Sequence, residues 1–129
     1  PQLRAKHDPY FKLIEDHVRD LNQRIPAAKI AVVPCGEAVL ALRAKVIQGA
    51  APGVRTQNEL FTDVLGHPGP QIRVLSAYCH FAVLYRRSPV GLPVPGQLAK
   101  LPEAAKLNRL LQEIAWQVVV AHPLSGVGK

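Results

Sequence analysis

The sequence is poor in cysteine and charge and has no long apolar run, and each shortage excludes a class of protein. Two cysteines cannot build a disulfide framework. Charged residues make up only 19% of the chain, which argues against a disordered protein. No apolar run approaches the roughly 20 residues that a membrane-spanning helix requires. There is also no signal-peptide pattern and no methionine, so we expect the natural chain to start upstream of Pro1.

What the sequence does contain suits a single packed unit. Hydrophobic residues make up 48% of the 129 residues, which is enough for one core. The formal net charge is +7, but the cations are spread along the chain and only Arg86 and Arg87 are adjacent. Because no aromatic residues alternate with the cations, this pattern favours a solvated basic surface over a nucleic-acid groove. The positive charge is also compatible with a negatively charged substrate or partner.

Apolar spacing and turn residues predict four helices and one strand. The helices show apolar residues at helical spacing, and proline or glycine marks several of their ends. Residues 29–33 are short, apolar and rich in β-branched side chains, which is typical of a buried strand. The predicted elements are helix 9–25, strand 29–33, helix 36–48 stopped by Gly49, loop 49–69, helix 71–87, a proline- and glycine-rich arm at 88–102, and helix 103–121.

The single strand decides the predicted fold class. A helix–strand–helix order indicates a parallel sheet, yet one strand cannot satisfy its own backbone N–H and C=O groups once it is buried. Its partners must be weak strands in the loops or strands upstream of Pro1, and we favour the second. We therefore predict that residues 1–129 form one unit, the C-terminal part of a larger α/β domain.

The segment Phe61–Pro70 carries the best candidates for chemistry. Asp63 and His67 can touch only if the loop turns, and Gly66 permits the positive φ of such a turn. Pro68 disfavours the α region for His67, so this histidine should lie just before a helix. A carboxylate that orients an imidazole makes a general base for acyl transfer. The alternative is that Asp63 caps the turn and that His67 has no catalytic role.

A nucleophile is harder to find. None of the three serines, Ser76, Ser88 and Ser125, lies in a Gly-x-Ser-x-Gly elbow or a Gly-Asp-Ser motif. Cys35 follows the predicted strand and opens a helix, a position that lowers a thiol pKa. It could pair with His67, or it could simply fill space at the end of the strand. Cys79 is expected in the core.

No metal or phosphate site is expected from the sequence. The remaining histidines have no paired spacing with one another or with cysteine. The glycines do not form a phosphate-binding loop. The histidines outside the Asp63–His67 segment are His7, His17, His80 and His122.

Several segments together resemble the C-terminal portion of SGNH/GDSL-type hydrolases, in particular an uncharacterised bacterial branch. The resemblance covers about residues 10 to 125. The segments that carry it are Ala31–Ala38, Phe61–Pro68, Ala77–Tyr85 running into Arg87–Pro93, and Leu110–Trp116.

The resemblance implies a three-layer α/β/α fold with a mainly parallel sheet, present here as a helix-rich C-terminal fragment with one or few strands. It implies that His67 is the general base and that Asp63 orients it, while the serine and the other oxyanion donors belong to blocks that this sequence lacks. The usual family spacing is Asp-x-x-His, whereas three residues separate Asp63 from His67 here.

Two functions are therefore expected. The first is an esterase-type hydrolase with a Ser-His-Asp mechanism, which needs no cofactor and acts on lipid, carbohydrate or small-molecule esters. The resemblance also weakly implies an exported protein. The second is a non-catalytic α/β module that engages an anionic partner through its basic surface.

Overall fold

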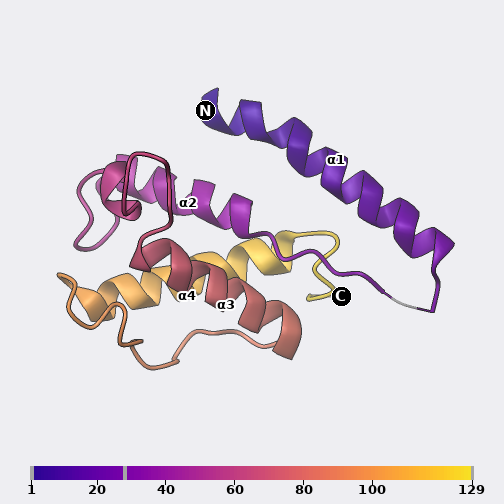
Figure 1. Ribbon diagram of the computed structural model, residues 1–129. Coiled ribbons are helices and arrows are strands. Elements are labelled where there is room, and N and C mark those ends of the chain that lie inside the picture. The colour runs from indigo at the N-terminus through magenta and orange to yellow at the C-terminus, as the bar shows by residue number, and fades with distance from the viewer. Residues whose placement is uncertain (1, 28, 129) are drawn as a thin grey trace.

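The protein is a bundle of helices in which three α-helices form the body and a fourth lies along one side (Figure 1). The computed structural model describes residues 2–27 and 29–128, so Pro1 and Lys129, the ends of the predicted unit, lie outside the described residues. Within these ranges no helix is long and apolar enough to cross a membrane. The helical elements are α1 (Gln2–Arg24), α2 (Cys35–Ile47), the short 3-10 helix η1 (Gln57–Leu60), α3 (Pro70–Tyr85) and α4 (Ala104–Ala121).

The predicted α/β fold is wrong for the described residues, which contain no β-strand. The predicted strand at 29–33 is an irregular, exposed to half-buried segment. Its polar groups bind side chains and a turn instead of a neighbouring strand. The Asn22 amide bonds the N–H and C=O of Ile30 at 2.7 and 2.9 Å, and the Val32 N–H donates to the Leu124 carbonyl at 2.9 Å. The apolar, β-branched composition favoured a strand, but residues 2–27 and 29–128 contain no partner strand to complete one.

The helix predictions are largely confirmed. Helices α2, α3 and α4 lie within two residues of their predicted bounds, and Gly49 follows α2 with a φ of +69°. Helix α1 ends at Arg24 as expected but begins at Gln2, so Pro9 lies inside the helix instead of at its start. Proline removes one backbone hydrogen bond there without ending the helix. The loop 49–69 contains η1, which the sequence did not reveal.

The core lies where α2, α3 and α4 meet. Helix α3 packs against both other helices, which confirms the prediction that it is covered on more than one side. Leu42, Leu75 and Leu111 come from these three helices and are fully buried. Burial of such side chains contributes roughly 1.5–3 kcal/mol each, so this three-helix contact is the main source of stability.

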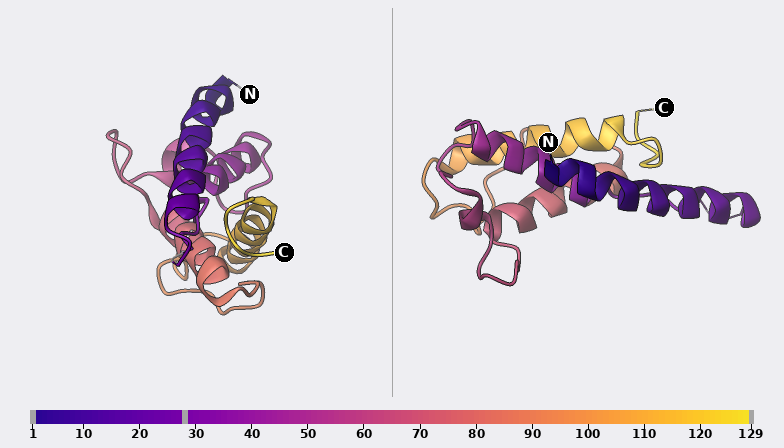
Figure 2. Two further views of the ribbon diagram at one scale, coloured as in Figure 1. Left: turned by 90° about the vertical axis from the view of Figure 1, so that its right-hand side faces the viewer. Right: turned by 90° about the horizontal axis from the view of Figure 1, so that it is seen from above.

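Helix α1 is attached more loosely than the others. Val18 is its one buried residue, and the views in Figure 2 show it running along the body and past its edge. The Phe11 ring lies so close to Gly36 that a Cβ placed there would be 2.8 Å from it. Glycine at position 36 therefore allows α1 to approach the start of α2.

The proline- and glycine-rich segment 88–102 is held to the core by buried polar side chains. The Tyr78 hydroxyl donates to Asn108 Oδ1 at 2.6 Å. The Gln112 amide donates to the Leu92 carbonyl at 2.8 Å and accepts the Gly91 N–H at 3.1 Å. Helix α4 thus satisfies backbone groups that have no helix or strand partner.

Tyr78→Phe should destabilise the fold, because it removes the donor from the buried Asn108 Oδ1. We expect the free energy of unfolding to fall by about 1–3 kcal/mol in urea denaturation. Tyr85→Phe is the matched control, since Tyr85 is exposed, and it should change stability by less than about 0.5 kcal/mol. Equal effects of the two substitutions would contradict the buried network.

Candidate functional site

The loop between η1 and α3 is closed at its base by backbone hydrogen bonds. Phe61 and Pro68 form an isolated antiparallel bridge. The Thr62 N–H donates to the His67 carbonyl at 2.9 Å, and the Gly69 N–H donates to the Leu60 carbonyl at 2.8 Å. Gly66 has a φ of +91°, the conformation for which a glycine was expected here. The chain therefore turns back within the few residues that separate Asp63 from His67.

The turn brings the two predicted catalytic side chains into contact. Asp63 Oδ2 accepts a hydrogen bond from Nδ1 of the His67 ring. Asp63 Oδ1 also accepts the Leu65 N–H at 3.0 Å and the His67 N–H at 3.2 Å. The aspartate therefore does both things that the sequence suggested: it orients the imidazole and it caps the turn.

These contacts define the protonation of the pair. Hydrogen bonds from His67 and from backbone N–H groups hold the pKa of the Asp63 carboxyl below its ordinary value of 3.8. An ionised carboxylate only accepts hydrogen bonds, so Nδ1 of the neutral His67 ring carries the proton. Nε2 then carries a lone pair, and the side chain is 65% exposed. The ring can accept a proton at Nε2 from a group that approaches from outside.

Cys35 is the first residue of α2 and contacts His80 and not His67, the histidine considered as its possible partner from the sequence. Its Sγ lies 3.9 Å from Nδ1 of His80 on α3, while His67 bonds Asp63. The pKa of the Cys35 thiol is lowered from 9.0 to about 6, first by a hydrogen bond from the Cys79 thiol and then by His80 and Ser76. Cys79 is buried as predicted, and its own pKa is raised by the neighbouring Cys35 sulfur.

His80 is oriented to support a Cys35 thiolate and not to deprotonate the thiol. Its Nδ1 donates to the Ser76 carbonyl at 2.8 Å, so Nδ1 carries the proton in the neutral ring. The atom that faces the sulfur is therefore an N–H donor. Such a group stabilises negative charge on sulfur but cannot take the thiol proton through the same nitrogen.

Cys35 lines an apolar cavity of about 480 Å³ beside the loop at 61–68. Gly66 and Pro68 from the loop form part of its wall. The remaining walls come mainly from apolar side chains of α1, α2, η1 and the start of α3. They include Phe11, Val39, Leu60 and Ile72.

None of the three serines hydrogen-bonds to the His67 ring in the part of the chain that the structure describes. Ser125 is buried, and its hydroxyl donates to the His122 carbonyl and accepts the Val127 N–H. The Ser88 hydroxyl accepts the Val90 N–H. Ser76 lies within α3. The hydroxyls of Ser88 and Ser125 therefore serve local turns.

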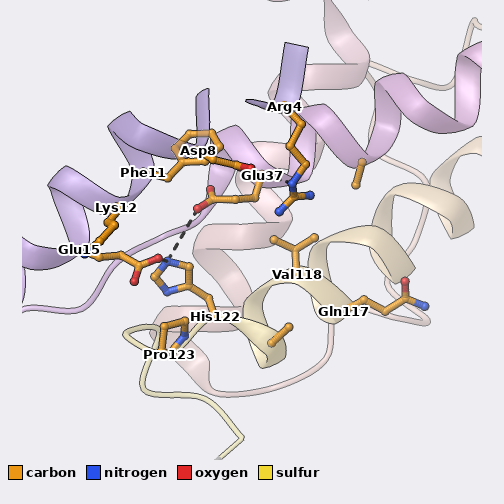
Figure 3. A pocket seen from close by; sticks show the side chains of 12 residues that line it. Arg4, Asp8, Phe11, Lys12, Glu15, Glu37, Gln117, Val118, His122 and Pro123 are labelled. Carbon is orange, nitrogen blue, oxygen red and sulfur yellow. Dashed lines mark ion pairs between the residues drawn. The ribbon is translucent and has the colours of Figure 1, made fainter. Parts of the chain in front are cut away.

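A second group of side chains was missed by sequence reasoning. Glu15 of α1, Glu37 of α2 and His122 at the end of α4 converge on one another (Figure 3). The three residues lie far from one another in the sequence, so no motif could have indicated the group. Only the packing of three helices creates it.

Comparison of the chain with protein-family models, curated proteins and solved structures found no match. The function is therefore argued from the geometry of the residues themselves.

The Cys35 thiol should titrate far below an ordinary thiol. We expect the rate of alkylation by iodoacetamide to rise with pH around a midpoint of about 6. Cys79→Ala should move the midpoint towards 9, because it removes the largest cause of the shift, whereas Cys79→Ser keeps a donor and should move it less. A midpoint near 9 in the unsubstituted protein would contradict the contact with Cys79.

The Asp63 carboxyl should titrate below 3.8 when followed by NMR. A depressed pKa in the folded state means that the carboxylate contributes to stability above pH 3.8. That contribution is lost as the pH falls through the folded-state value. His67→Ala should move the Asp63 titration upward, since the ring is the largest cause of the depression. An unchanged Asp63 titration would show that the ring does not contact the carboxylate in solution.

Proposed function

We propose that this chain contributes the Asp–His half of a Ser-His-Asp site that hydrolyses ester bonds. The observation that carries the proposal is the contact between Asp63 Oδ2 and His67 Nδ1. This contact leaves Nε2 of His67 as the basic nitrogen. A histidine that deprotonates a serine needs its lone pair at that atom. This role of the Asp63–His67 pair does not require an α/β fold.

The chemistry follows from this arrangement. His67 Nε2 takes the serine proton as the serine oxygen attacks the ester carbonyl, and Asp63 stabilises the imidazolium that forms. The imidazolium then gives its proton to the departing alcohol oxygen. In the second half-reaction His67 takes a proton from water, which attacks the acyl-enzyme and releases the acid and the serine. The closed loop at 61–68 supports this role, because it fixes both side chains on one short turn.

The nucleophile in this proposal is a serine from outside the 129 residues, either elsewhere in a longer chain or in a second chain. The serines of the present sequence support that assignment, since Ser88 and Ser125 are engaged in local turns. The substrate class is an ester of a lipid, a carbohydrate or a small molecule.

A second candidate is favoured by a separate observation. Cys35 has a thiol pKa of about 6 and lines an apolar cavity. A thiol that is already ionised at neutral pH needs no general base to attack an acyl carbonyl. The thiolate displaces the ester's alkoxide, which takes a proton from water, and leaves a thioester. Water then hydrolyses the thioester and releases the acid and the Cys35 thiolate. In this alternative the Asp63–His67 pair is structural.

Hydrolysis of p-nitrophenyl acetate by the 129-residue chain and by the natural full-length protein tests both candidates. The 129-residue chain should show no turnover above background, because an aspartate and a histidine act only together with their nucleophile. In the full-length protein His67→Ala should lower kcat by about 10⁴-fold or more. His17→Ala is the control, since His17 is exposed on α1.

The other outcomes are equally informative. A fully active His67→Ala protein would exclude His67 as the general base. Turnover by the 129-residue chain that Cys35→Ala abolishes would establish the thiol candidate. No turnover by either protein would favour the non-catalytic alternative, in which the basic surface engages an anionic partner.

A further inference from the structure

A second cavity, of about 440 Å³, lies between α1, α2 and the C-terminal end of α4. Unlike the cavity beside Cys35, it is lined by several charged side chains. Figure 3 shows the carboxylates of Glu15 and Glu37 beside the His122 ring at the wall of this cavity. The proposed hydrolase chemistry uses none of these three residues.

The distances among the three side chains suit a shared cation better than hydrogen bonds. His122 Nε2 lies 3.5 Å from Glu15 Oε1 and 3.8 Å from Glu37 Oε1. One potential ligand atom from each residue lies within 4.8 Å of the other two. Two donors that each lie about 2.0–2.2 Å from one zinc ion in tetrahedral geometry are about 3.3–3.6 Å apart. Small side-chain movements would therefore place all three donors around one ion.

The burial of the His122 ring is independent evidence for a bound cation. The residue is only 8% exposed, and its Nε2 has no hydrogen-bond partner although it is buried. The Leu124 N–H donates to Nδ1 at 3.2 Å, which holds the ring so that Nε2 faces the two carboxylates. A buried polar atom without a partner is costly, and an ion at this position would give it one.

The charges of the Glu15 and Glu37 side chains also favour a bound cation. The side chains of Glu15 and Glu37 are only 22% and 17% exposed, and both carboxylates lie on the Nε2 side of the His122 ring. Glu15 also pairs with Arg19 at 3.0 Å, whereas among the described residues the one ion-pair partner of Glu37 is His122 itself. Arg4 and Lys12 also line the cavity, but they pair with Asp8 and Asp16. The Glu37 carboxylate therefore keeps negative charge that a divalent cation would neutralise.

We propose that Glu15, Glu37 and His122 bind one divalent transition-metal ion of the zinc class. One imidazole nitrogen and two carboxylate oxygens suit zinc better than magnesium or calcium, which prefer oxygen ligands alone. The ion bonds to the Nε2 lone pair, so the proton on Nε2 leaves to solvent or moves to Nδ1, where it displaces the Leu124 N–H. Three protein ligands leave a position open to the cavity for water or a ligand oxygen.

The three ligands come from three helices, so the ion should also fasten α1 to the body. Few other contacts do so, since Val18 is the one buried residue of α1. Zinc binding should therefore slow amide hydrogen exchange in α1 more than in α3, which is already packed against α2 and α4.

Calorimetric titration of chelator-treated protein with Zn²⁺ tests the proposal, and Co²⁺ absorption serves as a spectroscopic probe. We expect one ion per chain and a rise in thermal midpoint, with much weaker binding of Mg²⁺. Glu37→Gln and Glu15→Gln should each weaken Zn²⁺ binding by about 100-fold or more. His17→Gln and Asp63→Asn are matched controls that remove an exposed imidazole and the other carboxylate–imidazole pair, and both should bind Zn²⁺ normally.

His122→Gln is the most direct variant, but His122 is buried and its loss could unfold the end of α4. The two glutamate variants therefore decide the question, with circular dichroism to confirm that they fold. Absence of Zn²⁺ binding by the folded protein would overturn the proposal. So would normal binding by both glutamate variants, or binding that Asp63→Asn abolishes.

Discussion

The first turn of α2 is the structural feature on which the Cys35 thiol and the proposed metal site both depend. Three consecutive residues there each face a different helix: Cys35 contacts His80 of α3, Gly36 faces Phe11 of α1, and Glu37 faces His122 at the end of α4. The buried leucines of α2, α3 and α4 fix the position of this turn. Because a helix directs successive side chains to different faces, one turn can contribute to a thiol environment and to a charged cavity at the same time.

Local backbone groups then decide how each imidazole can act. The neutral His67 ring carries its proton on Nδ1 because Asp63 accepts it, and His80 does so because the Ser76 carbonyl accepts it. His122 is the opposite case, because the Leu124 N–H occupies Nδ1 and leaves the proton on Nε2. His67 is thus arranged to accept a proton at an exposed atom, His80 to support a thiolate, and His122 to face two carboxylates. The proposed base and the proposed metal site follow from these three orientations.

The sequence predicted what depends on neighbouring residues and missed what depends on packing between helices. The ends of α1 and α2 were predicted to within one residue from Pro26 and Gly49. The Asp63–His67 contact followed from a loop with a glycine. Segment 29–33 was predicted as a strand because its side chains favour one, but a strand also needs a neighbour that composition does not reveal. The contact of Cys35 with His80 was not foreseen, because His80 reaches it only through the packing of α3 on α2. Glu15, Glu37 and His122 left no local signal at all.

The protonation of the three rings is the central claim, and a long-range ¹H–¹⁵N NMR spectrum of the histidine side chains measures it directly. In metal-free protein at a pH where the rings are neutral, we expect His67 and His80 to carry the proton on Nδ1. His122 should carry it on Nε2. A His67 ring protonated on Nε2 would contradict the account, because its lone pair would then face Asp63 and the ring could not act as the proposed base.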